Sequence, residues 1–174
     1  MRICIIPETG IDESLLSFLE EKLSRIFGNA KVKTGFLIPE TAFNSYRQQF
    51  NAEMVLKSLP IPDRKKCNLI LGVTEKDLFA DGLNFVFGIA EPLSGKALIS
   101  TARLKNSFYG LPEDKELLKV RTLKEAVHEI GHLLGLPHCP DERCVMSFSN
   151  SITDVDRKSF YFCPRCLKVI YSAM

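Results

Sequence analysis

Apolar residues along the first 135 positions occur either in short continuous runs or at helical spacing. The run over residues 2–6 predicts a buried strand, and the leucines and isoleucines of residues 13–27 recur at helical period and predict an amphipathic helix. A strand followed by a helix favours an α/β protein. The other elements expected in this part are strands over residues 31–36, 67–73, 84–90 and 96–101 and helices over residues 52–59 and 116–134.

The last two strands and the long helix set the expected layout. The strand at 67–73 is continuously apolar, which is typical of a central position in a sheet. The final two strands are joined by a short link, which favours an antiparallel pair. Gly135 and Pro137 have the chemistry that ends a helix.

The segment after the long helix differs from the rest of the chain. Residues 136–174 are rich in turns and cysteine and show weak periodicity. A chain of 174 residues suits one domain with its own core. We therefore expect a single domain over residues 1–174, with an N-terminal subdomain at 1–135 and a C-terminal subdomain at 136–174.

Charge and hydropathy argue against several classes of partner. The chain carries 23 basic and 21 acidic residues, which are interspersed and give a formal net charge of +2. This pattern favours neither nucleic acid nor a membrane surface, and no apolar run approaches the length of a signal peptide or a membrane span. We expect a cytoplasmic monomer without nucleic-acid or membrane partners, in which Cys4 and Cys67 are ordinary reduced core thiols.

All three histidines of the chain lie between residues 128 and 138. His128 and His132 are four residues apart on the predicted helix, so both imidazoles face one side and can reach a single metal ion at about 2.0–2.1 Å. Gly135 permits a tight turn that brings His138 to the same ion. Three nitrogen ligands leave the fourth tetrahedral position for water, which is typical of a catalytic zinc.

Glu129 follows the first histidine and is predicted to be the general base. It would take a proton from the zinc-bound water and pass it to the leaving amine, while zinc lowers the pKa of that water towards about 7 and polarises the scissile carbonyl. A chance grouping of histidines is one alternative, and a third ligand from a later glutamate is another. The position of His138 after Gly135 argues against both.

Four of the six cysteines cluster near the C-terminus. They form a Cys-x4-Cys pair and a Cys-x-x-Cys pair, which together supply four sulfurs and a closed structural zinc site. Such a site could supply most of the folding free energy of this segment. Redox chemistry, an iron–sulfur cluster and a nucleic-acid-binding zinc ribbon are the alternatives, and the absence of a basic and aromatic stripe argues against the last. The residues are Cys139, Cys144, Cys163 and Cys166.

With both motifs, the sequence resembles the archaemetzincins, a family of the metzincin clan in which an extended His-Glu motif is followed by four cysteines and an intervening methionine. The resemblance implies a metzincin-like α/β (α+β) fold. This fold has a mixed, mostly parallel twisted sheet with an antiparallel edge strand, packed on an active-site helix, and a small Cys-rich zinc-binding C-terminal subdomain. The matching residues are His128, Glu129, His132, Gly135, His138, Cys139, Cys144, Met146, Cys163 and Cys166.

The resemblance also implies two zinc ions, one catalytic and held by the three histidines, the other structural and held by the four cysteines. Met146 would pack beneath the catalytic site, and an extended peptide would pair with the edge strand, for which residues 84–90 are the candidate. Tyr109 and Tyr161 are the candidates for a tyrosine that some metzincins use near the metal.

The expected function is zinc-dependent hydrolysis of peptide bonds, on small peptides or amino termini. A catalytically silent zinc- and peptide-binding protein that keeps the same fold is the first alternative. An interaction module built on the cysteine-bound zinc is the second. The three hypotheses differ in whether the function of the protein requires Glu129 and the three histidines.

Overall fold

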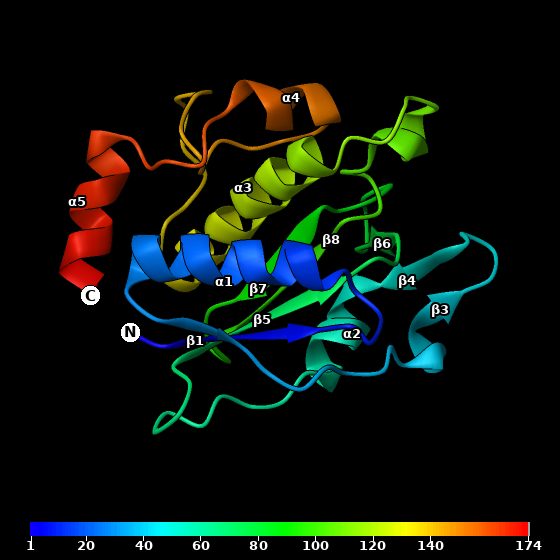
Figure 1. Cartoon of the computed structure of the whole chain (residues 1–174), viewed down its shortest axis with the longest axis horizontal. Coiled ribbons are helices and arrows are strands. Elements are labelled where there is room, and N and C mark those ends of the chain that lie inside the picture. The colour runs from blue at the N-terminus through cyan, green and yellow to red at the C-terminus, as the bar shows by residue number, and fades with distance from the viewer. Residues whose placement is uncertain (174) are drawn as a thin grey trace.

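A five-stranded mixed sheet lies at the centre of the structure, with helices on both of its faces (Figure 1). The computed structural model describes residues 1–173. Strands β2, β1, β5 and β8 are parallel, and β7 pairs antiparallel with β8 at the edge, which confirms the predicted sheet. In this order, the five strands comprise Ala30–Val32, Ile3–Pro7, Leu69–Thr74, Lys96–Ser100 and Gly88–Glu91.

Alternate side chains along the parallel strands contribute to two separate cores. Ile3 and Ile5 of β1 belong to the core beneath helices α1 (Glu13–Phe27) and α3 (Lys115–Leu133). Cys4 and Ile6 belong to the core beneath α2 (Ala52–Ser58). Every residue of β1 is therefore buried, as is typical of a parallel strand that is covered on both faces.

Both long helices begin and end within one residue of their predicted bounds. The side chain of Asp12 accepts a hydrogen bond from the backbone N–H of Ser14 at 2.7 Å, and the side chain of Asp114 accepts one from Leu117 at 2.9 Å. Gly28, with a φ of 99°, follows the last residue of α1. Among residues 1–173, no helix combines the length and apolar character needed to cross a membrane.

Shorter elements account for the differences from the predicted strands. The strand expected at 31–36 is reduced to β2, because Phe36 retains only an isolated bridge to Glu8. The strand expected at 84–90 begins at Gly88. A second, three-stranded sheet and two 3-10 helices were not predicted: β3 (Phe43–Asn44), β4 (Gln49–Asn51), β6 (Leu78–Phe79), η1 (Glu40–Ala42) and η2 (Asn106–Tyr109).

The C-terminal segment contains two helices that its weak periodicity did not predict. Helix α4 (Ile152–Arg157) has six residues and is too short to show a helical period. Helix α5 (Pro164–Ala173) begins inside the Cys-x-x-Cys motif. Cys166 and Ile170 of α5 are buried in the same core as α1 and α3, so this segment packs directly on the main body.

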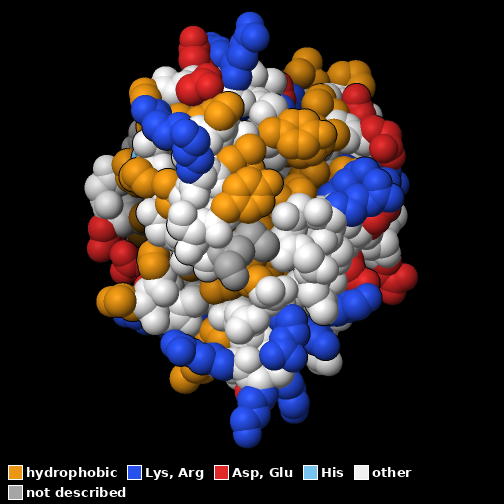
Figure 2. Space-filling model, turned by 90° about the vertical axis from the view of Figure 1, so that its left-hand side faces the viewer, with side chains coloured by type: hydrophobic (Ala, Val, Ile, Leu, Met, Phe, Trp, Pro, Cys, Tyr) orange, Lys and Arg blue, Asp and Glu red, His pale blue; other side chains and the backbone are white. Residues whose placement is uncertain are grey.

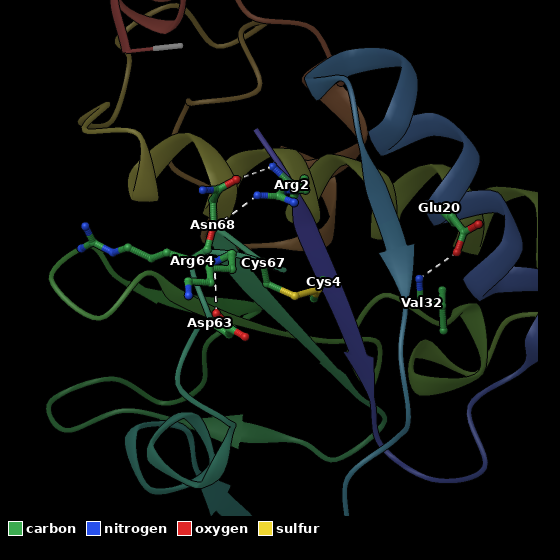
Figure 3. Close-up of a disulfide and its surroundings, with 9 residues drawn as sticks. Arg2, Cys4, Glu20, Val32, Asp63, Arg64, Cys67 and Asn68 are labelled. Atoms are coloured by element: carbon green, nitrogen blue, oxygen red, sulfur yellow. Dashed lines mark hydrogen bonds between the residues drawn. A yellow bond between two sulfur atoms is a disulfide. The ribbon is translucent and has the colours of Figure 1, made fainter.

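Cys4 and Cys67 form a disulfide, so the prediction that they are reduced core thiols is wrong (Figure 3). Both residues are buried, as expected. The carbonyl of Arg2 accepts hydrogen bonds from the backbone N–H groups of Asn68 and Leu69, which holds the start of β5 beside β1. The Cα atoms of the two cysteines consequently lie 5.7 Å apart, a distance that a disulfide can span.

Replacing Cys4 and Cys67 together with alanine is expected to lower the free energy of unfolding by about 4 kcal/mol. The disulfide closes a loop over a sequence separation of 63 and therefore restricts the unfolded chain. Urea unfolding of the oxidised protein and the double variant, both with zinc present, measures the difference. Wild type treated with a phosphine reductant should match the variant, and equal stability of all three samples would contradict the prediction.

Candidate metal centres

Helix α3 carries His128 and His132 one turn apart, and their Nε2 atoms lie 3.0 Å from each other. The helix is held in place by apolar residues such as Val127 and Ile130, which are fully buried in the core. The spacing of four residues places both imidazoles on the same side of this fixed helix. The structure thus brings together the first two predicted ligands.

His138 reaches the same point after a tight turn. Gly135 has a φ of 91°, and the backbone N–H of Leu136 donates to the carbonyl of Gly131 at 3.0 Å. The ring of His138 lies 5.3 Å from that of His128 and 4.9 Å from that of His132, between centroids. One ligand nitrogen from each of the three histidines lies within 4.8 Å of the others.

Backbone carbonyls orient two of the three rings. Nδ1 of His128 lies 2.8 Å from the carbonyl oxygen of Val145, and Nδ1 of His132 lies 2.7 Å from that of Leu136. When each Nδ1 donates its proton to the carbonyl, Nε2 keeps a free lone pair for a metal. Burial lowers the pKa of all three histidines, which favours the neutral, metal-binding form.

The donor set fits zinc. Nitrogen ligands at about 2.0–2.1 Å from a tetrahedral zinc lie about 3.3 Å from one another. The 3.0 Å between the two Nε2 atoms of α3 is close to this separation. Two rings on one helix and a third from the following turn can therefore share one ion with little rearrangement.

Glu129 directly follows the first of these histidines on α3, and its side chain is buried. The edge strand restricts its position, because a Cβ atom on Gly88 would lie 2.9 Å from Oε1 of Glu129 and 2.7 Å from the carbonyl oxygen of Leu98. Burial, and then the nearby Glu125 carboxylate, raise the pKa of Glu129 well above its usual value of 4.5, while Lys158 acts in the opposite direction. A carboxyl group with a raised pKa can both accept and return a proton.

For the zinc-dependent peptide hydrolysis expected from the sequence, replacing Gly88 with alanine should lower kcat by about 10- to 100-fold without loss of zinc. The added methyl group would overlap the carbonyl of Leu98 and the carboxyl of Glu129, and so displace the latter. Peptide cleavage and zinc content per chain provide the measurement. Ala90→Gly, which changes the same strand by one methyl group, serves as the control, and an unchanged kcat for Gly88→Ala would contradict the prediction.

Met146 packs against the underside of α3. It is fully buried, and its Sδ occupies the space into which a side chain on Gly131 would project. Its carbonyl accepts a hydrogen bond from the backbone N–H of Cys139 at 2.9 Å. Met146 therefore packs against α3 at Gly131 and holds the backbone of Cys139, the residue after His138.

The four C-terminal cysteines converge on one point. Their sulfur atoms all lie within 4.8 Å of one another. The distances from Cys139 to Cys163 and from Cys144 to Cys166 are both 3.8 Å between Sγ atoms. Sulfurs at about 2.3 Å from a tetrahedral zinc lie about 3.8 Å apart, so the four thiols fit a closed site.

Several sulfur atoms of this cluster accept hydrogen bonds from nearby N–H groups. Sγ of Cys144 accepts from the backbone N–H groups of Met146 and Cys163, and Arg165 donates to Sγ of Cys139 at 3.4 Å. The backbone N–H of Cys166 is the largest of several hydrogen bonds that lower the pKa of Cys163 to about 7. Burial raises the pKa of the Cys144 and Cys166 thiols, and a bound zinc ion would favour their deprotonation.

One backbone segment connects the two clusters. Cys144 contributes a sulfur, and the carbonyl of the next residue, Val145, accepts the hydrogen bond from His128. At the other end, Cys139 directly follows His138. A shift of the sulfur cluster would therefore move His138. It would also move the carbonyl of Val145, which orients His128.

A buried ion pair near Glu129 was not predicted. Nζ of Lys158 lies 3.0 Å from Oε1 of Glu125, and the two side chains are 0% and 4% exposed. Glu125 lies on α3 one turn before Glu129, and Lys158 directly follows α4. A charged residue on the apolar side of a helix is a signal that could have identified Glu125, whereas no local pattern marks Lys158.

Two surface hollows lie away from the histidine and cysteine clusters. One of about 660 Å³ is lined by α1 and β2. Another, about 370 Å³ and mainly apolar, is lined by the end of α1 and residues 160–162, at the end of the molecule where Figure 2 shows hydrophobic side chains gathered. Tyr161 lines this second hollow and Tyr109 donates to the carbonyl of Arg103, and neither lines the cavity that contains Glu129.

Known proteins match the chain over nearly its whole length. The family model described as Peptidase family M54 matches residues 21–172. An archaemetzincin from Methanocaldococcus jannaschii is 53% identical over 168 residues, which cover 97% of this chain and 92% of that protein. The crystal structure of an archaemetzincin from Methanopyrus kandleri is 39% identical with a TM-score of 0.85, over 99% of this chain and 94% of the other. A zinc-dependent peptidase from Methanocorpusculum labreanum is 30% identical with a TM-score of 0.86, over 97% and 99% respectively.

Proposed function

Because this chain belongs to peptidase family M54, the archaemetzincins, and is a zinc metallopeptidase, we propose where and how it acts. It hydrolyses peptide bonds at the centre formed by His128, His132 and His138, with Glu129 as the general base. The observation that carries this proposal is the convergence of three imidazoles, together with a buried carboxyl group on the residue that follows the first of them. Such a pairing of metal ligands and base is suited to the attack of water on a carbonyl.

The three histidines are the proposed ligands of the catalytic zinc. Their lowered pKa values and the carbonyl partners of two Nδ1 atoms support this role, because both leave a nitrogen lone pair for the metal. When bound, the zinc would lower the pKa of a coordinated water to about 7 and polarise the carbonyl of the scissile bond.

Glu129 is the proposed proton carrier. It takes a proton from the attacking water while the water oxygen bonds to the carbonyl carbon, and it gives this proton to the leaving nitrogen as the C–N bond breaks. Its burial and raised pKa support this role, because they allow the carboxyl to hold the proton between the two steps. The absence of a side chain at Gly88 leaves room for the carboxyl group, because a Cβ atom there would lie 2.9 Å from Oε1 of Glu129.

Strand β7 is the proposed partner for the substrate backbone. It is an edge strand, paired with β8 on one side, and its other side can accept an extended peptide as an added strand. Its first residue, Gly88, adjoins Glu129, so a peptide bound along β7 would pass close to the base. Small peptides or amino termini are the proposed substrates.

A second zinc held by Cys139, Cys144, Cys163 and Cys166 is proposed to be structural. The sulfur separations support it, and four sulfur ligands leave no position for water. The burial of Cys166 in the core shared with α1 and α3 supports the treatment of residues 1–135 and 136–174 as two parts of one domain. Met174, the last residue of that domain, lies outside the described residues.

Removal of zinc with a chelator is expected to abolish cleavage of a mixture of unstructured peptides. Addition of zinc, but not of magnesium, should restore it, since imidazole and thiolate ligands prefer zinc to magnesium. Mass spectrometry of the products measures cleavage, and elemental analysis before treatment should give two zinc ions per chain. Cleavage that persists after both ions have been removed would contradict the proposed function.

A further inference from the structure

Lys158 is a buried lysine that the proposed mechanism does not use. Its side chain is 0% exposed, and its Nζ lies 3.0 Å from Oε1 of Glu125 on α3. The pair does not have hydrogen-bond geometry, so the contact is mainly electrostatic. Burial of two charges is costly, and two apolar side chains of similar volume are often at least as stable. Stability alone therefore does not explain why this pair is present.

The residues that begin with Lys158 run alongside the segment that contains Met146. Two backbone hydrogen bonds join residues 158–161 to residues 143–147, the shorter of them at 2.9 Å. In the other, the backbone N–H of Val145 donates to the carbonyl of Tyr161 at 3.0 Å. The position of the 143–147 segment thus depends on that of residues 158–161.

The 143–147 segment meets α3 at two points. Nζ of Lys158 donates to the carbonyl of Ser147 at 3.5 Å while it pairs with Glu125 on α3. Three residues further along α3, Nδ1 of His128 lies 2.8 Å from the carbonyl oxygen of Val145. The ion pair and the histidine contact lie on the same interface, so the distance from α3 to Val145 depends on both.

This distance matters for the histidine cluster. A ring that donates through Nδ1 to a carbonyl keeps the lone pair of Nε2 directed at a metal. His128 is buried, so a ring that loses the carbonyl of Val145 does not gain water in its place. Loss of such a partner typically lowers metal affinity by about 10- to 100-fold.

Lys124 provides an internal comparison. It lies on α3 and is buried, and its Nζ donates to the carbonyls of Val155 and Asp156 at 2.9 and 3.3 Å. These bonds attach α4 to α3, but neither reaches the 143–147 segment. Lys124 and Lys158 are therefore both buried lysines between the same elements, and they differ in the link to the histidine cluster.

We propose that Lys158 is a positioning residue for the histidine-bound zinc. Through its ion pair with Glu125 it holds the 143–147 segment where the carbonyl of Val145 orients His128. It acts through these contacts and not by contact with the substrate. The proposal rests on the proposed function only for the assignment of His128 as a zinc ligand.

Replacing Glu125 and Lys158 together with methionine tests this role. The double variant nearly keeps the volume of both side chains and removes both charges of the pair, so the fold is expected to persist. The dissociation constant of the histidine-bound zinc should rise about 10-fold or more. Zinc-buffered solutions and elemental analysis, between one and two ions per chain, measure this constant. Lys124→Met is the matched control and should leave it unchanged.

Nuclear magnetic resonance of the zinc-loaded protein supplies a second measurement that does not depend on cleavage. In wild type, the Nδ1 proton of His128 should exchange slowly with water, because the ring is buried and faces the carbonyl of Val145. The double variant should exchange this proton about 10-fold faster or more. Exchange at His132 should stay the same, since its Nδ1 faces the carbonyl of Leu136 instead.

Either an unchanged zinc affinity or an unchanged exchange at His128 in the double variant would overturn the proposal. Equal changes in Lys124→Met would overturn it as well, because they would trace the effect to the packing of α4. If the methionine variant does not fold, the pair of substitutions Glu125→Gln and Lys158→Met is judged by the same two measurements. A wild type that binds two zinc ions but cleaves no peptide contradicts the proposed function and leaves this role of Lys158 intact.

Discussion

Replacing Glu129 with glutamine is expected to lower kcat by about 10³-fold while the protein keeps both zinc ions. Glutamine has the same shape as glutamate and can retain the contact with Gly88, but its amide cannot take a proton from water. The KM should change little, because the variant loses a function that operates only during the reaction. Kinetics on a cleaved peptide, with zinc content determined by elemental analysis, provide the measurement.

Glu116→Gln is the matched control for this experiment. It makes the same change on the first turn of the same helix, where the side chain is 82% exposed, and it should leave kcat unchanged. If wild type and Glu129→Gln cleave at the same rate, the role of Glu129 as general base is wrong. If neither cleaves any peptide although both bind zinc, the chain is better described as a catalytically silent binder with the same fold.

Replacing Cys163 with serine is expected to remove the structural zinc and to unfold the C-terminal segment locally. Structural zinc in small zinc-binding peptides contributes about 10–16 kcal/mol of binding free energy, which is also folding free energy. Loss of one of the four sulfur ligands should remove much of this binding free energy. Because Cys139 follows His138, affinity for the catalytic zinc and peptide cleavage should fall as well. Zinc content and hydrogen exchange over residues 136–173 measure these effects.

The reciprocal variant His128→Ala serves as the comparison. It should lose the catalytic zinc and all measurable cleavage, yet keep the structural zinc and the protection of the C-terminal segment from exchange. The expected result is therefore asymmetric, with the sulfur cluster supporting the histidine cluster but not the reverse. Unchanged exchange in Cys163→Ser would show that packing of α5 on the main core stabilises this segment without the metal.

The sequence was most informative where the physical determinants are local. The bounds of α1 and α3 follow from the helical period of their leucines and from the turn at Gly135, and the structure places both helices within one residue of the prediction. The approach of His128 to His132 follows from helix geometry alone. The whole histidine motif spans one helix end and one turn, so few conformations are compatible with it.

The tertiary structure decided everything that depends on residues distant in the chain. The disulfide between Cys4 and Cys67 exists because β1 and β5 pair, and the position of Glu129 is restricted by Gly88 from the edge strand. The ion pair of Glu125 with Lys158 likewise requires α3 to meet the segment after α4. Sequence patterns report which residues a local element places on one side, whereas such contacts arise only when separate elements pack together.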